Sequence, residues 1–222
     1  VPLTIRFGRD EYVDGVDLEP GEFCSKRTSS TTLPETAAPS AGAFLDTYRQ
    51  LLEEGAEGVV AITMSGRLSA TYQSAVIAAE QHGGPIKVFD SRNVSMGLGF
   101  QVLAAARAAE HGGDLDAVGQ AAHAVADRTH LVAALDTLEF LKRGGRIGGA
   151  QAIIGTLLDV KPLISIQDGV VEAAGRVQAF VTPSLLADLE RHPENGWSLT
   201  GLREALARQD RALDAADLEP RI

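Results

Sequence analysis

A group of small hydroxyl residues follows a short apolar run in the first half of the chain. Residues 58–63 are apolar and partly β-branched, which is typical of a buried strand. Ser65 and Ser69 come next in a short loop, and an alanine-rich helix is expected to begin just after them. A strand that leads through hydroxyls to a helix N-terminus offers free amide N–H groups and a positive dipole, which suit an anion. The alternative is that Ser69 only caps the helix.

Two further side chains could reach an anion from distant loops. Thr36 lies just before Ser40, which is predicted to cap the following helix, so Thr36 has no capping role of its own. Arg146 lies among four glycines, which would let its guanidinium extend into a cleft. The alternatives are a solvated threonine and a surface arginine on a flexible loop. Together the hydroxyls and the arginine predict an anion-binding site.

Over residues 1–127, predicted strands alternate with predicted helices, and these elements position the side chains. A strand at 58–63 leads to a helix that ends near residue 82, a strand at 86–91 follows, and helices are predicted at 96–110 and 115–127. Strands that alternate with helices predict a parallel sheet with crossover helices. Ligands of such sheets gather at the carboxyl ends of the strands, where Ser65, Ser69 and Ser91 would lie. Residues 26–40, rich in Ser, Thr and Pro, are predicted to form a loop.

The pattern changes after residue 127, so a domain boundary is predicted near Arg128. Residues 138–143 are expected to form a short helix, and residues 152–158 an apolar helix. Residues 162–172 indicate a β-hairpin that turns at Asp168-Gly169. The sequence therefore predicts an α/β protein of two domains: a parallel-sheet domain at 1–127, and an α+β domain with antiparallel strands at 128–222.

Composition and charge exclude several classes of function. The 222 residues carry a formal net charge of −10, whereas a general nucleic-acid surface needs a basic stripe. Cys24 is the only cysteine, which fits a reducing compartment and predicts a cytoplasmic protein. No apolar run approaches the roughly 20 residues that span a bilayer, which leaves only transient membrane contact open.

Several chemical motifs are absent from the sequence. It contains neither a Gly-x-x-x-x-Gly-Lys-Ser/Thr nucleotide loop nor a Gly-x-Ser-x-Gly nucleophile elbow, and its histidines lack zinc-ligand spacing. Gly97-x-Gly99 lacks the third glycine of a dinucleotide fingerprint and is interpreted as close packing. No cofactor or metal is therefore expected.

Several separated motifs, in order, resemble the DegV family of bacterial fatty-acid-binding proteins. They are Val1-Pro2-Leu3, Thr36-Ala37-Ala38-Pro39-Ser40, Leu68-Ser69-Ala70-Thr71-Tyr72-Gln73-Ser74-Ala75, Asp90-Ser91-x-x-x-Ser95-Met96-Gly97, Leu141-x-x-Gly144-Gly145-Arg146-Ile147 and Lys161-Pro162. The resemblance covers residues 1–177, and none is found over 178–222. Relative to the family, the chain is expected to lack a first strand before Val1 and a closing segment near the carboxyl end.

The resemblance implies a function for the predicted anion site. A long-chain fatty acid would lie in a tunnel at the domain junction, with its carboxylate bound by Thr36 and Ser69. Arg146 would present that carboxylate or dock a partner, with Ser65, Ser91 and Gly145 in supporting positions. The partner implied is a separate ATP-dependent fatty acid kinase that makes an acyl phosphate, so the chain itself would not be an enzyme.

Two other interpretations stay open at this point. The same Ser/Thr/Arg site could belong to an enzyme that acts on a phosphorylated or carboxylated metabolite, although the sequence offers no nucleophile–base pair for it. The chain could also be an altered family member that serves mainly in contacts with other proteins.

Overall fold

The computed structural model describes residues 1–30, 32–153 and 160–178 of the chain. Three sheets follow one another along the sequence: an antiparallel sheet in the order β2-β1-β3, a parallel pair β4-β5, and an antiparallel sheet in the order β6-β7-β8. Over the described residues the structure is thus α/β, with a parallel sheet followed by antiparallel strands as the sequence predicted, and with an amino-terminal antiparallel sheet that it did not predict. The elements are β1 Thr4–Phe7, β2 Asp10–Val13, α1 Pro20–Ser29, β3 Glu35–Ala37, α2 Ala41–Glu53, β4 Val59–Thr63, α3 Thr71–His82, β5 Ile86–Asp90, α4 Ser95–Glu110, α5 Leu115–Ala126, β6 Val132–Ala134, α6 Glu139–Arg143, the 3₁₀ helix η1 Gly148–Ile153, β7 Val160–Gln167 and β8 Val170–Gln178.

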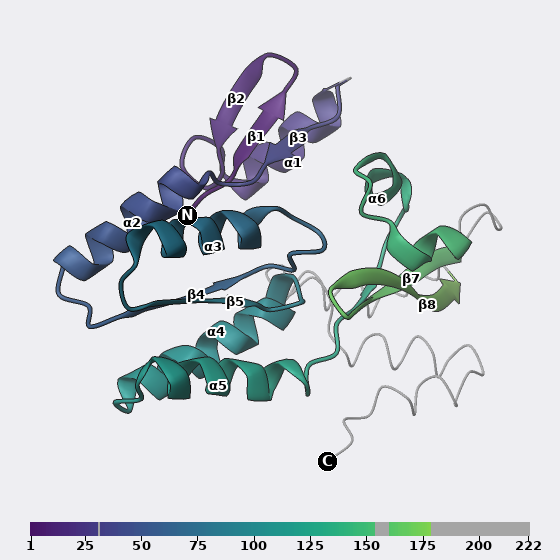
Figure 1. Ribbon diagram of the computed structural model, residues 1–222. Helices are drawn as coiled ribbons and strands as arrows, with labels where there is room; N and C mark the ends of the chain where they lie inside the picture. Colours follow the sequence, from purple (N-terminus) through teal and green to yellow (C-terminus); the bar gives the residue numbers. More distant parts are fainter. Residues whose placement is uncertain (31, 154–159, 179–222) are drawn as a thin grey trace.

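The parallel pair β4-β5 lies between two layers of helices (Figure 1). Side chains alternate along β4, so Val59 and Ala61 pack with α2 and α3, whereas Val60 and Ile62 pack with α4 and α5. Apolar residues on both faces explain why the sequence of β4 is a continuous apolar run. Both strands run in the same direction, and their carboxyl ends therefore meet at one edge.

The amino-terminal sheet corrects one prediction from the sequence. Residues 26–40 were expected to form a loop, but α1 extends to Ser29 and residues 35–37 form β3 beside β1. Glu19 and Glu22 form a capping box with Pro20 at the first turn, a start signal that lies outside the predicted loop. The serine content misled because Ser25 and Ser29 donate their hydroxyls back to carbonyls one turn earlier in the helix.

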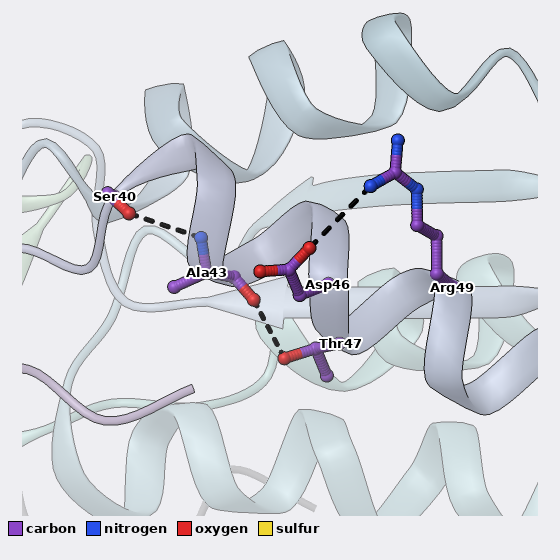
Figure 2. A network of polar contacts seen from close by, with 5 residues as sticks. All are labelled: Ser40, Ala43, Asp46, Thr47 and Arg49. Atoms are coloured by element: carbon purple, nitrogen blue, oxygen red, sulfur yellow. Dashed lines mark hydrogen bonds and ion pairs between the residues drawn. The ribbon is translucent and has the colours of Figure 1, made fainter.

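The start of α2 confirms the predicted cap. Ser40 has an extended backbone, and its Oγ accepts a hydrogen bond from the Ala43 amide at 3.1 Å (Figure 2). One turn further on, the Thr47 hydroxyl donates to the Ala43 carbonyl, and Arg49 pairs with Asp46 on the exposed face (Figure 2). The cap fixes where the chain leaves β3 and enters the helix layer.

Tyr48 is expected to make the free energy of unfolding fall at alkaline pH. Its side chain is 2% exposed, its hydroxyl donates to the Ala75 carbonyl at 3.3 Å, and burial raises its pKa from 10.0 to about 12. The unfolded chain loses this proton near pH 10 and the folded chain only near pH 12. The contribution of Tyr48, about 2 kcal/mol, is therefore fully present below pH 10 and is lost as the pH rises to 12. Denaturation in urea across this range should show the fall in wild type and its absence in Tyr48→Phe; equal falls in both would contradict the assignment.

The carboxyl-terminal sheet contains the predicted hairpin. β7 and β8 pair in antiparallel register through the turn at Asp168 and Gly169, and α6 is the expected short helix. The helix predicted at 152–158 is corrected in part, because residues 148–153 form η1; residues 154–159 and 179–222 lie outside the described residues. The division of the chain into domains 1–127 and 128–222 stays a prediction. None of the helices among the described residues is long and apolar enough to span a membrane.

Candidate anion-binding site

The loop that follows β4 is folded around the buried hydroxyl of Ser65. The side chain is 0% exposed, and its Oγ accepts a hydrogen bond from the Arg67 amide at 3.2 Å. The Ser65 carbonyl accepts bonds from the amides of Leu68 and Ser69, at 3.0 and 3.1 Å. These bonds form a compact turn, so Ser65 shapes the loop and presents Ser69 at its far end.

The carboxyl-terminal sheet holds this same loop from the other side. Ser65 Oγ donates to the carbonyl of Gly169, in the β7-β8 turn, at 2.6 Å. Leu68 packs against the core beneath that sheet, where Ile147 and Val171 are buried. We call the meeting point of residues 64–70, 91–94, 144–149 and 168–169 the junction. The junction joins the parallel pair to the carboxyl-terminal sheet, at the carboxyl ends of β4 and β5 (Figure 1).

Ser69 lies just before α3, and its hydroxyl can donate a hydrogen bond. The helix begins at Thr71, whose amide donates to Ser69 Oγ at 3.3 Å, and the two hydroxyls lie 2.8 Å apart. When Thr71 donates across that pair, the Ser69 hydroxyl proton remains available for another acceptor. The N-cap of α3 is Ala70, and the helix has no side-chain cap bond, so the interpretation of Ser69 as the cap is wrong. Ser69 instead precedes the cap and accepts one amide bond, which leaves its hydroxyl able to donate to an anion.

Arg146 reaches the loop of Ser69 from the carboxyl-terminal part of the chain. Its Nε donates to the Leu68 carbonyl at 3.1 Å, and its Nη1 donates to the Gly144 carbonyl. Gly145 has φ +72°, a left-handed conformation that turns the chain back after α6 and directs Arg146 toward the junction. Two of its five N–H donors are thereby engaged, and the others remain for a ligand.

The loop after β5 is stabilised by hydrogen bonds within the loop, and the Ser91 hydroxyl makes two of them. Its side chain is 3% exposed, and its hydroxyl both accepts from the Asn93 amide and donates to the Asn93 carbonyl. Asp90 links the two loops, because its Oδ1 accepts from the amides of Gly66 and Arg92 at 3.2 and 2.8 Å. Sequence reasoning missed the role of Asp90, although a carboxylate directly at a strand's carboxyl end was the signal available.

Tight contacts also explain why residue 97, in the first turn of α4, is a glycine. A Cβ on Gly97 would lie 2.1 Å from Oδ1 of Asn93, which confirms the interpretation of this glycine as close packing. Gln101 is 2% exposed and donates from the same side to the Ser91 carbonyl at 3.0 Å. The loop after β5 is thus a rigid support for the junction.

Three arginines, Arg67, Arg92 and Arg146, lie at the junction. Arg67 and Arg92 both approach Gly169, since a Cβ there would lie 3.6 Å from Arg67 Cδ and from Arg92 Cα. None of the ion pairs found within residues 1–30, 32–153 and 160–178 involves Arg67, Arg92 or Arg146. Carboxylates of Asp90 and Asp168 lie beside these arginines, so an anion would be held by individual N–H donors such as those of Arg146 and not by a net positive field.

Thr36 is not brought to Ser69 by any hydrogen bond of the described residues. It lies in β3, opposite Ile5 of β1, and its side chain is exposed. The structure thus joins Ser65, Ser69 and Arg146, assigns Ser91 and Gly145 to the shape of the loops, and leaves Thr36 on the amino-terminal sheet. Its role with the anion stays a prediction.

The fold and the site define an α/β protein in which arginines and serines meet at a junction between a parallel and an antiparallel sheet. A family model described as "Uncharacterised protein, DegV family" matches residues 1–185. A DegV domain-containing protein of Streptomyces coelicolor is 36% identical over 221 residues, which are 98% of this chain and 77% of the relative. The chain belongs to the DegV family. Its similarity to relatives extends past residue 177, so the expectation of none over 178–222 is wrong.

Solved structures agree with the family. A Thermus thermophilus DegV family protein, described by its fatty acid binding, has a TM-score of 0.74 and 37% identity, over 96% of this chain and 69% of that one. A stearic-acid-binding protein of Eubacterium ventriosum has a TM-score of 0.72 and 25% identity, over 95% of this chain and 70% of that one. Both are proteins for which a fatty acid ligand is described.

Proposed function

We propose that this chain binds a long-chain fatty acid with its carboxylate at the junction. The observation that carries the proposal is the bond from Arg146 Nε to the Leu68 carbonyl, which places a guanidinium one residue from the Ser69 hydroxyl. The fatty acid ligands of the Thermus and Eubacterium proteins support the same ligand class here. Thr36 is proposed as the second hydroxyl, brought to the carboxylate when the ligand binds.

The energetics of such a ligand suit a protein that binds and then releases it. Burial of the acyl tail supplies about 0.8 kcal/mol per methylene, so the tail of the ligand provides most of the affinity. Neutral hydroxyls and an exposed arginine fix the carboxylate's position without burying it. The carboxylate then stays accessible to a second protein.

The bonding of the hydroxyls argues against the alternative of an enzyme acting on an anionic metabolite. Ser65 Oγ donates to a main-chain carbonyl, Ser91 Oγ is bonded to Asn93, and Ser69 Oγ is bonded to Thr71. None of these hydroxyls, as the structure describes them, is bonded to a histidine or a carboxylate that could activate it. Extraction with solvent followed by mass spectrometry should instead recover a bound acyl chain.

Replacing Ser69 with alanine is expected to weaken fatty acid binding about tenfold, because one donor to a charged group is lost. Titration calorimetry with palmitate measures the change. Thr71→Val is the matched control, since it removes the bond between the two hydroxyls but leaves the Ser69 hydroxyl and its bond from the amide of residue 71 in place. Equal losses in the two variants would mean that Ser69 acts only on the start of α3.

We also propose a separate ATP-dependent kinase as the partner. A carboxylate oxygen of the bound fatty acid would attack the γ-phosphorus of ATP on that kinase, which gives an acyl phosphate and releases ADP. The absence of a nucleotide loop in the sequence supports this division of labour. Acyl phosphate, trapped with hydroxylamine, should form only when kinase, ATP and this chain are combined; formation by this chain and ATP alone would contradict the proposal. Because Cys24 is the single cysteine of the sequence, no intrachain disulfide can form, which fits a cytoplasmic setting for this chain.

A further inference from the structure

The amino-terminal sheet and α1 form a unit with its own hydrophobic core. Ile5 and Phe7 of β1 are buried together with Leu18, and Phe23 of α1 packs against them. Because β3 pairs with β1, Thr36 lies opposite Ile5 and belongs to the same unit. We call β1, β2, β3 and α1 the amino-terminal unit. Its core and its strand pairing fix Thr36 relative to α1.

Arg27 of α1 connects this unit to α6. The guanidinium carbon of Arg27 lies 5.1 Å from the centre of the Phe140 ring (Figure 1). Leu138 is buried and Leu141 packs in the core beneath the carboxyl-terminal sheet, whereas Phe140 is 44% exposed. The two leucines hold α6 on its sheet, and the Phe140 ring faces away from that core to meet α1. A cation over an aromatic face is attracted by the negative face of the ring.

Phe140 is connected in turn to the guanidinium of Arg146. Its carbonyl accepts a hydrogen bond from the Gly144 amide at 2.9 Å, and the Gly144 carbonyl accepts from Arg146 Nη1. The Arg146 amide donates to the Leu141 carbonyl at 2.9 Å. A shift of α6 therefore moves both the backbone and the side chain of Arg146. The contact between Arg27 and the Phe140 ring restrains such a shift.

We propose that Arg27 and Phe140 are positioning residues that hold Arg146 at the junction. For the fatty acid the inference rests on the proposed function, in which Arg146 and Thr36 both bind the carboxylate. The contact joins the unit that carries Thr36 to the helix that precedes Arg146, so it restrains these two groups relative to each other. An exposed cation–π pair changes an equilibrium about threefold, so the contact favours this arrangement without making it rigid.

Amide hydrogen exchange without ligand tests the contact itself. Arg27→Ala should speed exchange of the Gly144 and Arg146 amides about threefold, because both amides report opening at the carboxyl end of α6. Phe140→Leu should do the same, since it keeps an apolar side chain but removes the ring. Phe140→Tyr keeps an aromatic face and should retain the wild-type rates. Unchanged rates in Arg27→Ala, or equal rates in the two Phe140 variants, would contradict the inference.

Palmitate titration tests whether the contact acts through Arg146. Arg27→Ala should weaken binding about threefold in the wild type and have no further effect in Arg146→Ala, where the residue that it positions is gone. Arg9→Ala is the matched control, because it removes the same charge from the exposed β1-β2 turn of the same unit and should leave the affinity unchanged. A threefold loss that persists in Arg146→Ala, or an equal loss in Arg9→Ala, would overturn the positioning role.

The two measurements separate this inference from the proposed function. If palmitate binds and Arg27→Ala changes neither exchange nor affinity, the positioning role is wrong and the proposed function stands. If palmitate does not bind and the exchange rates respond as expected, the proposed function is wrong and the contact still positions Arg146.

Discussion

Replacing Gly169 with alanine is expected to lower the free energy of unfolding by about 3 kcal/mol and to weaken fatty acid binding. Gly169 has φ +81°, where an alanine costs about 1–2 kcal/mol. An added Cβ would also lie 2.5 Å from Ser65 Oγ. Ser65 is completely buried and cannot move into solvent, so the loop or the turn must shift, which adds about 1–3 kcal/mol. That shift also breaks the bond that holds the Ser69 loop to the carboxyl-terminal sheet.

Gly112 supplies the matched control for this substitution. It has the same φ of +81°, but nothing lies within 4 Å of a Cβ built on it. Gly112→Ala should therefore cost only the conformational part, and the difference between the two variants measures the contact with Ser65. Adding Ser65→Ala to Gly169→Ala removes the clashing Oγ and should recover part of the loss in urea denaturation. If both alanine variants lose the same free energy of unfolding, the contact with Ser65 contributes nothing to the effect at Gly169.

The local pattern of the sequence was enough to predict the layered core. The continuous apolar run of β4 follows from helices on both of its faces, and the cap at Ser40 follows from a local rule about extended residues before a helix. Helix α1 was missed because its serines satisfy themselves within the helix, and their usual preference for loops gave the opposite prediction. Local rules succeed where the partner of a residue is close in sequence.

The site shows where such rules stop. The hydroxyls of residues 65 and 69 were found because they lie between a strand and a helix. The bond from Ser65 to Gly169 joins residues 104 positions apart, and that from Arg146 to Leu68 spans 78 positions. No periodicity or spacing predicts such contacts, because they depend on how the sheets meet. The role of Gly169 therefore became visible only in three dimensions.

Replacing Arg146 with alanine is expected to weaken fatty acid binding about thirtyfold, which is about 2 kcal/mol. The variant loses a positive charge near the carboxylate and also the bond that fixes the Leu68 carbonyl beside Ser69. Arg146→Lys should recover only part of the affinity, since an ammonium keeps the charge but cannot hold two carbonyls in the planar geometry of a guanidinium. Palmitate titrations at low and high salt separate the two losses, because salt screens the charge and leaves the geometry unchanged.

Arg143→Ala is the control that makes this prediction specific. It removes the same charge from the same segment, but Arg143 is exposed and pairs with Glu139 inside α6 rather than with the junction. Its palmitate affinity should stay close to that of the wild type at both salt concentrations. If Arg143→Ala weakens binding as much as Arg146→Ala, the fatty acid responds to the overall field of the segment and not to a guanidinium placed beside Ser69. If neither variant weakens binding, the carboxylate lies elsewhere and the junction is only a structural joint between the two sheets.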